Sequence, residues 1–129
     1  MLTLVSNDFV NQYIQQTSLV IREDLLEILQ MMALIAPEAE LVSDLGIPYF
    51  QQNGHWIYGV AAREDHLCVY FSDLNMLYSF ADRLPQAQFG DDCLIIYRLD
   101  EINRNVLLEL LGQIKVHFFI NRRDSSELV

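Results

Sequence analysis

The chain has 129 residues, of which 52% are hydrophobic, enough for one packed domain and too many for an intrinsically disordered chain. Eight basic against 18 acidic residues give a net charge of −10, which argues against nucleic-acid or anionic-lipid binding, since both need a basic surface. The first eleven residues lack the basic and apolar regions of a signal peptide, and the longest apolar run is far too short to span a membrane. We therefore expect one cytoplasmic domain over residues 1–129.

Two helices are predicted at the start of the chain. Residues 7–16 and residues 19–35 both place apolar side chains at steps of three and four positions, which is the spacing of one helix face. Ser6 or Asn7 is the expected cap of the first helix. Pro37 ends the second, because proline does not continue a helix.

The centre of the chain is predicted to form an antiparallel meander of three strands, over residues 48–52, 55–62 and 66–71. The dipeptide Asn53-Gly54 separates the first two strands. It is the strongest hairpin signal in the sequence, because a type I′ turn needs positive φ at both central residues.

The C-terminal half alternates between helix and strand. The predicted segments are a helix over residues 75–84 capped by Ser72 or Asp73, a strand over residues 93–98, and a long final helix that Asp100 caps. A polar tail over residues 121–129 follows, so the core of the domain spans about residues 8–115. This order predicts the α+β class, with a single antiparallel sheet and helices on one face.

Several short motifs occur in an order typical of one bacterial family. They are Gly46, Ile47, Pro48, Tyr49 and Phe50 with Asn53-Gly54 behind them, His66 where a strand begins, and Gly90 ahead of the strand that starts at Cys93. On these residues the chain resembles the YdhG-like family of small cytoplasmic domains, mostly of unknown function. The resemblance implies a single antiparallel sheet with helices packed on it. Because some members are described as frataxin-like iron chaperones, it also implies weakly bound iron and a protein client in iron handling.

Three carboxylates gather in one region of the second predicted helix, at Glu23, Asp24 and Glu27. Hard cations such as Fe²⁺ prefer carboxylates and water, so these residues are the candidate iron ligands. The alternative is a solvated helix face that keeps the protein soluble. In either case neutral substitutions at all three should leave folding intact, because they lie off the apolar stripe of the helix.

A second metal hypothesis concerns His66 and Cys68, which point to the same face of their predicted strand. Cys93 joins them if its strand lies alongside. Such nitrogen and sulfur ligands suit zinc or copper better than labile iron. The alternative is that they are ordinary half-buried strand residues, with two free thiols.

The sequence contains none of the motifs that mark common catalytic sites, such as a Walker loop, a dinucleotide-binding glycine pattern or a zinc-protease H-E-x-x-H run. A thiol nucleophile beside His66 lacks a third group to orient the base. We therefore expect that the protein is not an enzyme. Two hypotheses remain: an iron-handling protein with acidic surface ligands, and a non-enzymatic interaction module, homodimeric or partner-binding, that holds no metal.

The second face of the sheet is the candidate interface. In the strand over residues 66–71, the aliphatic and phenylalanine side chains are expected to face the helices, which leaves the alternate positions on the other face. That face then carries Cys68, Tyr70, Ile95 and Tyr97. It is more apolar than a water-facing sheet requires, which favours a homodimer or another partner. The alternative is that the final helix or the tail folds back over it.

Overall fold

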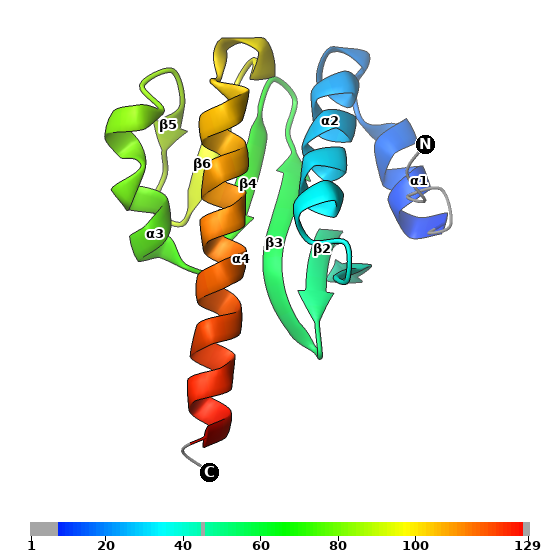
Figure 1. Cartoon of the computed structure of the whole chain (residues 1–129). Coiled ribbons are helices and arrows are strands. Elements are labelled where there is room, and N and C mark those ends of the chain that lie inside the picture. Colours follow the sequence, from blue (N-terminus) through cyan, green and yellow to red (C-terminus); the bar gives the residue numbers. More distant parts are fainter. Residues whose placement is uncertain (1–7, 45, 128–129) are drawn as a thin grey trace.

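The computed structural model describes residues 8–44 and 46–127, which form helices packed against a single sheet (Figure 1). In chain order the elements are α1 (Asp8–Gln16), α2 (Leu19–Ile35), β1 (Glu40–Asp44), β2 (Ile47–Gln52), β3 (His55–Ala62), β4 (Leu67–Phe71), α3 (Leu74–Ser79), the 3-10 turn η2 (Ala81–Arg83), β5 (Gln88–Phe89), β6 (Cys93–Ile96), the 3-10 turn η3 (Leu99–Glu101) and α4 (Arg104–Glu127). Within these residues, no helix combines the length and apolar character that a membrane span requires.

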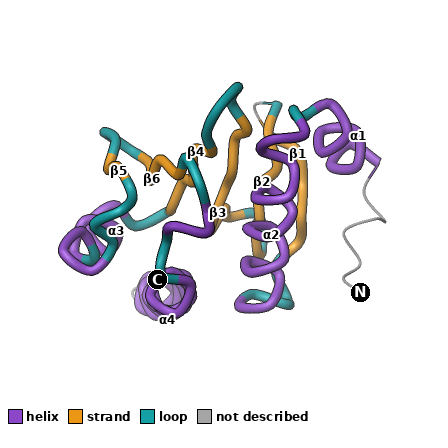
Figure 2. The backbone as a smooth tube through the Cα atoms, turned by 90° about the horizontal axis from the view of Figure 1, so that it is seen from above, coloured by secondary structure: helices purple, strands orange, loops and turns teal. Residues whose placement is uncertain are grey.

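The described strands form one six-stranded sheet in the order β1-β2-β3-β4-β6-β5, and every neighbouring pair is antiparallel. Helices α2, α4 and α3 lie along one face, whereas α1 lies beside the edge formed by β1 and β2 (Figure 2). The predicted class, a single antiparallel sheet with helices on one face, is confirmed. Helix α4 stays on the helix-covered side of the sheet and extends beyond the end of the sheet (Figure 1). Up to residue 127 it therefore does not fold back over the opposite face.

The predicted meander is present as β2, β3 and β4, and β3 has the predicted bounds. Its first turn has positive φ at both central residues, 54° at Asn53 and 79° at Gly54, as the type I′ prediction requires. Further into the hairpin, Phe50 pairs with Tyr58 and Gln51 pairs with Trp56, so β3 contains a bulge in which one residue is unpaired.

Both predicted N-terminal helices are present, α2 with its predicted bounds, while the expected cap residues Ser6 and Asn7 lie outside the described residues. Arg22 joins the two helices. Its guanidinium donates hydrogen bonds to the carbonyl oxygens of Ile14 and Thr17 at 3.1 and 3.0 Å. These bonds attach α2 to the last turn of α1 and to the residue that follows it, and the Ile14 carbonyl oxygen also accepts a bond from the backbone N–H of Thr17 at 3.2 Å.

The sequence pattern misses two short strands at the edges of the sheet. Strand β1 pairs along its length with β2, and β5 pairs with β6. Acidic residues and serine, which are depleted in strands, make up most of β1, so its pairing with β2 overrides its own low propensity. Strand β5 has only two residues, too few for any periodicity to reveal.

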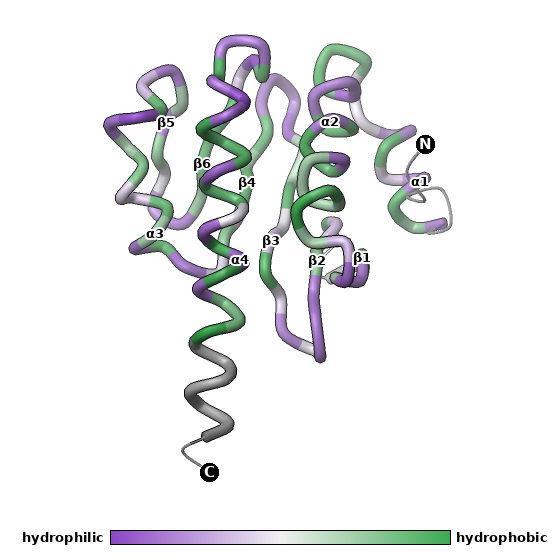
Figure 3. Tube along the Cα trace, in the orientation of Figure 1, coloured by the Kyte–Doolittle hydropathy of each residue, from purple (hydrophilic) through white to green (hydrophobic). Residues whose placement is uncertain are grey.

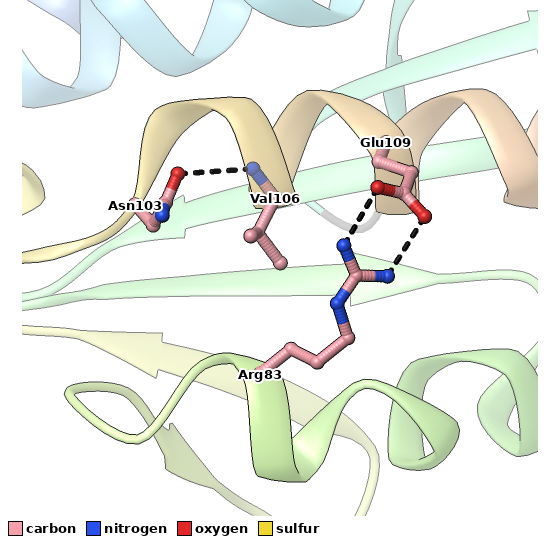
Figure 4. Close-up of polar contacts among 4 residues, drawn as sticks. All are labelled: Arg83, Asn103, Val106 and Glu109. Atoms are coloured by element: carbon pink, nitrogen blue, oxygen red, sulfur yellow. Dashed lines mark hydrogen bonds and ion pairs between the residues drawn. The ribbon is translucent and has the colours of Figure 1, made fainter.

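The predicted helix over residues 75–84 is divided into α3 and η2. Asp73 caps α3 as predicted, and its carboxylate accepts a hydrogen bond from the backbone N–H of Met76 at 3.0 Å. The following turn carries Arg83, whose guanidinium binds both carboxylate oxygens of Glu109 on α4 at 2.7 Å (Figure 4). This ion pair ties η2 to the final helix.

The final helix begins later than predicted. Its cap is Asn103 rather than Asp100, since the Asn103 side-chain oxygen accepts a hydrogen bond from the backbone N–H of Val106 at 3.2 Å (Figure 4). Asp100 lies in η3 instead, where the Arg98 guanidinium donates to its carboxylate at 3.0 and 3.3 Å. Asn caps a helix as well as Asp does, so the residue types alone do not decide between Asp100 and Asn103.

The main core lies between the helix-covered face of the sheet and helices α2 and α4. Hydrophobic residues run along β3, β4 and β6, whereas the β2–β3 turn is hydrophilic (Figure 3). Tyr58 is fully buried at the centre of this core, and its hydroxyl donates a hydrogen bond to the carbonyl oxygen of Leu111 on α4. This bond joins the middle of the sheet to the final helix.

Candidate functional site

The face of the sheet opposite α2, α3 and α4 is called the open face. Along β4, Leu67, Val69 and Phe71 point into the main core, whereas Cys68 and Tyr70 lie on the open face. The predicted assignment of the two faces of this strand is therefore confirmed.

Several side chains on the open face bury one another. A second small core there contains Ala61, Cys68 and Cys93, with Ile47, Tyr70 and Ile95 packed against them. The two cysteine residues are only 8% and 6% exposed, so they contribute little surface to a partner. At the rim Trp56 is 41% exposed and Tyr97 is 45% exposed, which keeps aromatic surface available. The exposed apolar surface on this face is therefore smaller than the sequence predicts, because Cys68 is buried in the second core and Tyr70 and Ile95 pack against it.

A hollow of about 480 Å³ lies beside this second core. Its lining includes the aromatic residues Tyr49, Trp56 and Tyr70 together with Arg63, Leu74 and Asp92. It is therefore a mainly apolar site with two opposite charges.

The aromatic wall of the hollow depends on Gly59, which lies in β3 between Tyr49 on β2 and Tyr70 on β4. A Cβ atom at Gly59 would lie 2.4 Å from the ring of Tyr49, so this ring rests directly on the glycine backbone. Such close approach explains why a glycine occupies the interior of a strand. Trp56 packs edge-on against the same ring, with 5.7 Å between ring centroids.

Arg63, which directly follows β3, supplies the positive charge of the hollow. Its guanidinium lies beside the polar side chains of Cys68 and Tyr70, and interaction first with Cys68 and then with Tyr70 raises its pKa above the ordinary value. The ion pairs found among the described residues do not include Arg63. Arg63 therefore presents to the open face a positive charge that forms no ion pair with a carboxylate of the described residues, although Asp92 lines the same hollow.

Cys68 and Cys93 are free thiols that lie against each other in the second core. Burial, and secondly the neighbouring Cys68, raises the pKa of the Cys93 thiol to about 12. A nucleophilic thiol needs the opposite shift, toward a lower pKa. Cys93 is thus arranged as a packing residue.

This arrangement predicts a loss of stability at alkaline pH. A raised pKa means that the folded protein holds the Cys93 proton more tightly than the unfolded chain. The resulting stabilisation is complete below about pH 9 and is lost as the pH rises toward 12. Melting temperatures measured from about pH 8 to about pH 11 should fall less steeply for Cys93→Ala than for the unmodified protein. Parallel curves for the two proteins would contradict this explanation.

The three candidate iron ligands all lie on α2, but two of them already have interactions. The Asp24 carboxylate accepts a hydrogen bond from the backbone N–H of Leu99 at 3.0 Å, and Glu27 forms an ion pair with Arg104. Glu23 is exposed. The expectation that neutral substitutions at all three leave folding intact is therefore revised, because α2 uses two of these carboxylates to hold the η3–α4 segment.

The alternative nitrogen and sulfur ligands also have other neighbours. His66 contacts the Asp65 carboxylate at 2.7 Å, and its ring lies 5.3 Å from the ring of Tyr97. Across the described residues, no group of three or more His, Cys, Asp or Glu side chains is arranged to hold a metal ion.

The remaining residues of the family motif form a turn and a strand. Gly46 has a φ of 81° and begins the hairpin of which Ile47, Pro48, Tyr49 and Phe50 form the first strand. The sequence alone does not mark Trp56, Arg63 or Asp92 as site residues, although all three line the hollow. The available signal was Gly59, an isolated glycine within a strand rich in aromatic residues.

Comparisons with known proteins establish the fold. No family model and no curated protein matches this chain. Among solved structures, the chain is similar to the crystal structure of YdhG, a protein of the DUF1801 family from Bacillus subtilis, with a TM-score of 0.71 and 17% sequence identity. The match covers 84% of this chain and 89% of that chain. The resemblance to the YdhG-like family that the sequence predicts is confirmed at the level of the fold.

Proposed function

We propose that the protein is a non-enzymatic binding module and that the hollow on the open face is its binding site. The observation that carries this proposal is the meeting of three aromatic side chains with an arginine that lacks a carboxylate partner in the described chain. Small-ligand sites typically measure about 300–1,000 Å³ and combine apolar walls with a few placed polar groups. The hollow agrees with both criteria.

Nuclear magnetic resonance tests this proposal directly, because Trp56 is the one tryptophan of the chain and gives a unique indole N–H signal. The probes are a neutral aromatic compound, an aromatic carboxylate and inorganic phosphate. We expect at least one aromatic probe to shift the Trp56 signal together with the backbone amides of Gly59 and Tyr70. Shifts scattered over the helices, or no shifts with any probe, would contradict a binding site in the hollow.

We also expect the protein to self-associate through the open face, as the predicted interface requires. Arg63 and Asp92 carry opposite charges on this face, so a two-fold axis can place the arginine of each copy opposite the aspartate of the other. Light scattering should give a mass above 15.0 kDa that rises with protein concentration and with salt, because salt screens the net charge of −10.

A matched pair of variants locates the interface. Trp56→Ser should lower the measured mass, whereas Val20→Ser, at a residue that is 81% exposed on α2, should leave it unchanged. A mass that stays at 15.0 kDa at every concentration would contradict self-association.

A frataxin-like iron chaperone, which the family resemblance suggests, is the alternative function. We place it second because Asp24 and Glu27 already bind Leu99 and Arg104. An anaerobic calorimetric titration with Fe²⁺ separates the two functions. Reversible micromolar binding that weakens in Glu23→Gln would favour iron handling, and the absence of binding heat would favour the binding module.

A further inference from the structure

We propose that the hollow on the open face binds a small planar aromatic monocarboxylate, with Arg63 holding the carboxylate and the rings of Tyr49 and Trp56 packing against the aromatic part. This inference rests on the proposed function, because it names the ligand class of the same hollow.

The aromatic wall selects a flat ligand. The ring of Tyr49 is held in place from below by the backbone of Gly59 and from the side by Trp56. Aromatic rings pack favourably in offset and edge-to-face arrangements, and a rigid ring loses little freedom on binding. Trp56 is partly exposed at the rim, so part of its surface is free to contact a ligand.

Arg63 selects a carboxylate. A guanidinium is a planar fork of donors whose geometry matches the two oxygens of a carboxylate. Burial raises the pKa of its neighbour Tyr70, whose hydroxyl therefore stays protonated at neutral pH and does not neutralise the arginine. The guanidinium thus keeps its charge, and it shares the lining of the hollow with Tyr70.

The remaining charges limit the ligand to a single negative charge. Asp92 lines the same hollow, and the whole chain carries a net charge of −10. Both repel polyanions such as nucleotides, because like charges in one site cost free energy that a single arginine does not offset. The volume of about 480 Å³ accommodates two fused rings with one carboxylate.

The test uses 2-naphthoate and its neutral analogue 2-naphthamide, titrated calorimetrically at a protein concentration where light scattering gives a monomer. We expect Arg63→Gln to weaken naphthoate binding at least about tenfold, since a charge-assisted pair of hydrogen bonds is lost. Naphthamide should bind the unmodified protein more weakly by a similar factor. Arg98→Gln, which removes an exposed arginine outside the hollow, should bind naphthoate unchanged.

A second variant tests the aromatic wall. Gly59→Ala places a Cβ atom against the ring of Tyr49, and it should weaken naphthoate and naphthamide alike. Circular dichroism confirms that each variant is folded.

The outcomes separate the two proposals. Equal affinities for naphthoate and naphthamide, or undiminished naphthoate binding by Arg63→Gln, would overturn the carboxylate ligand and leave the hollow as the binding site. If neither compound binds, the monocarboxylate proposal fails. The binding module then depends on the broader probe titration of Trp56.

Discussion

Replacing Tyr58 with alanine should lower the free energy of unfolding by about 3–5 kcal/mol, the range for removing a large aromatic side chain from a packed core. Its ring is fully buried and makes edge-on contacts with Phe50 and Phe71, at centroid distances of 6.5 and 6.2 Å. Its hydroxyl also holds the carbonyl oxygen of Leu111 on α4. Tyr58→Ala therefore removes packing within the sheet and a link between β3 and the final helix. Urea unfolding followed by circular dichroism measures the loss.

Tyr58→Phe is the matched control, because it keeps the ring and removes only the hydroxyl. We expect it to cost about 1 kcal/mol, the net contribution of one hydrogen bond. If the two variants were equally destabilised, the stabilisation would come from the hydroxyl and not from packing.

Asp24→Ala should lower the free energy of unfolding by about 1.5–3 kcal/mol, the usual contribution of a hydrogen bond to a charged group. Asp24 on α2 binds the backbone N–H of Leu99, which lies in η3 just after the last strand. Without the carboxylate, the partly buried N–H of Leu99 loses its hydrogen-bond acceptor. The segment that joins η3 to α4 then loses this attachment to α2. The same urea titration measures the effect.

Glu23→Gln is the control for Asp24, since Glu23 is exposed on the same helix. Its effect should stay within about 0.5 kcal/mol, as for most surface substitutions. Destabilisation by Glu23→Gln as large as that by Asp24→Ala would assign the effect to the charge of the helix face instead of to the bond with Leu99.

Local signals predicted the parts of the fold that depend on few residues. The Asn53-Gly54 turn fixes the register of its hairpin, because positive φ at two successive residues is available to few residue types. The apolar spacing of α2 likewise defines its bounds. In contrast, β1 exists because β2 offers it a pairing edge, and α4 begins at the Asn103 cap while Asp100 pairs with Arg98 in η3. These outcomes depend on contacts that a single segment does not reveal.

In the candidate site, too, local signals predict some residues, whereas others depend on contacts between segments. Simple alternation placed Cys68 and Tyr70 on the open face. Alternation would put Trp56 on the same face as Tyr58, but the bulge in β3 reverses this, so that Trp56 reaches the open face while Tyr58 enters the core. The sequence does not point to Arg63, because this residue lies just beyond the end of β3 and no spacing rule places it in the same hollow as Tyr70.

Chemical footprinting of arginine tests most directly whether the hollow is the binding site. Phenylglyoxal modifies accessible guanidinium groups, and mass spectrometry measures the modified fraction at each arginine with and without saturating 2-naphthoate. We expect Arg63 to be modified in the free protein and protected by the ligand, and the exposed Arg98 to be modified equally in both samples. Unchanged modification of Arg63 in the presence of bound naphthoate would contradict it.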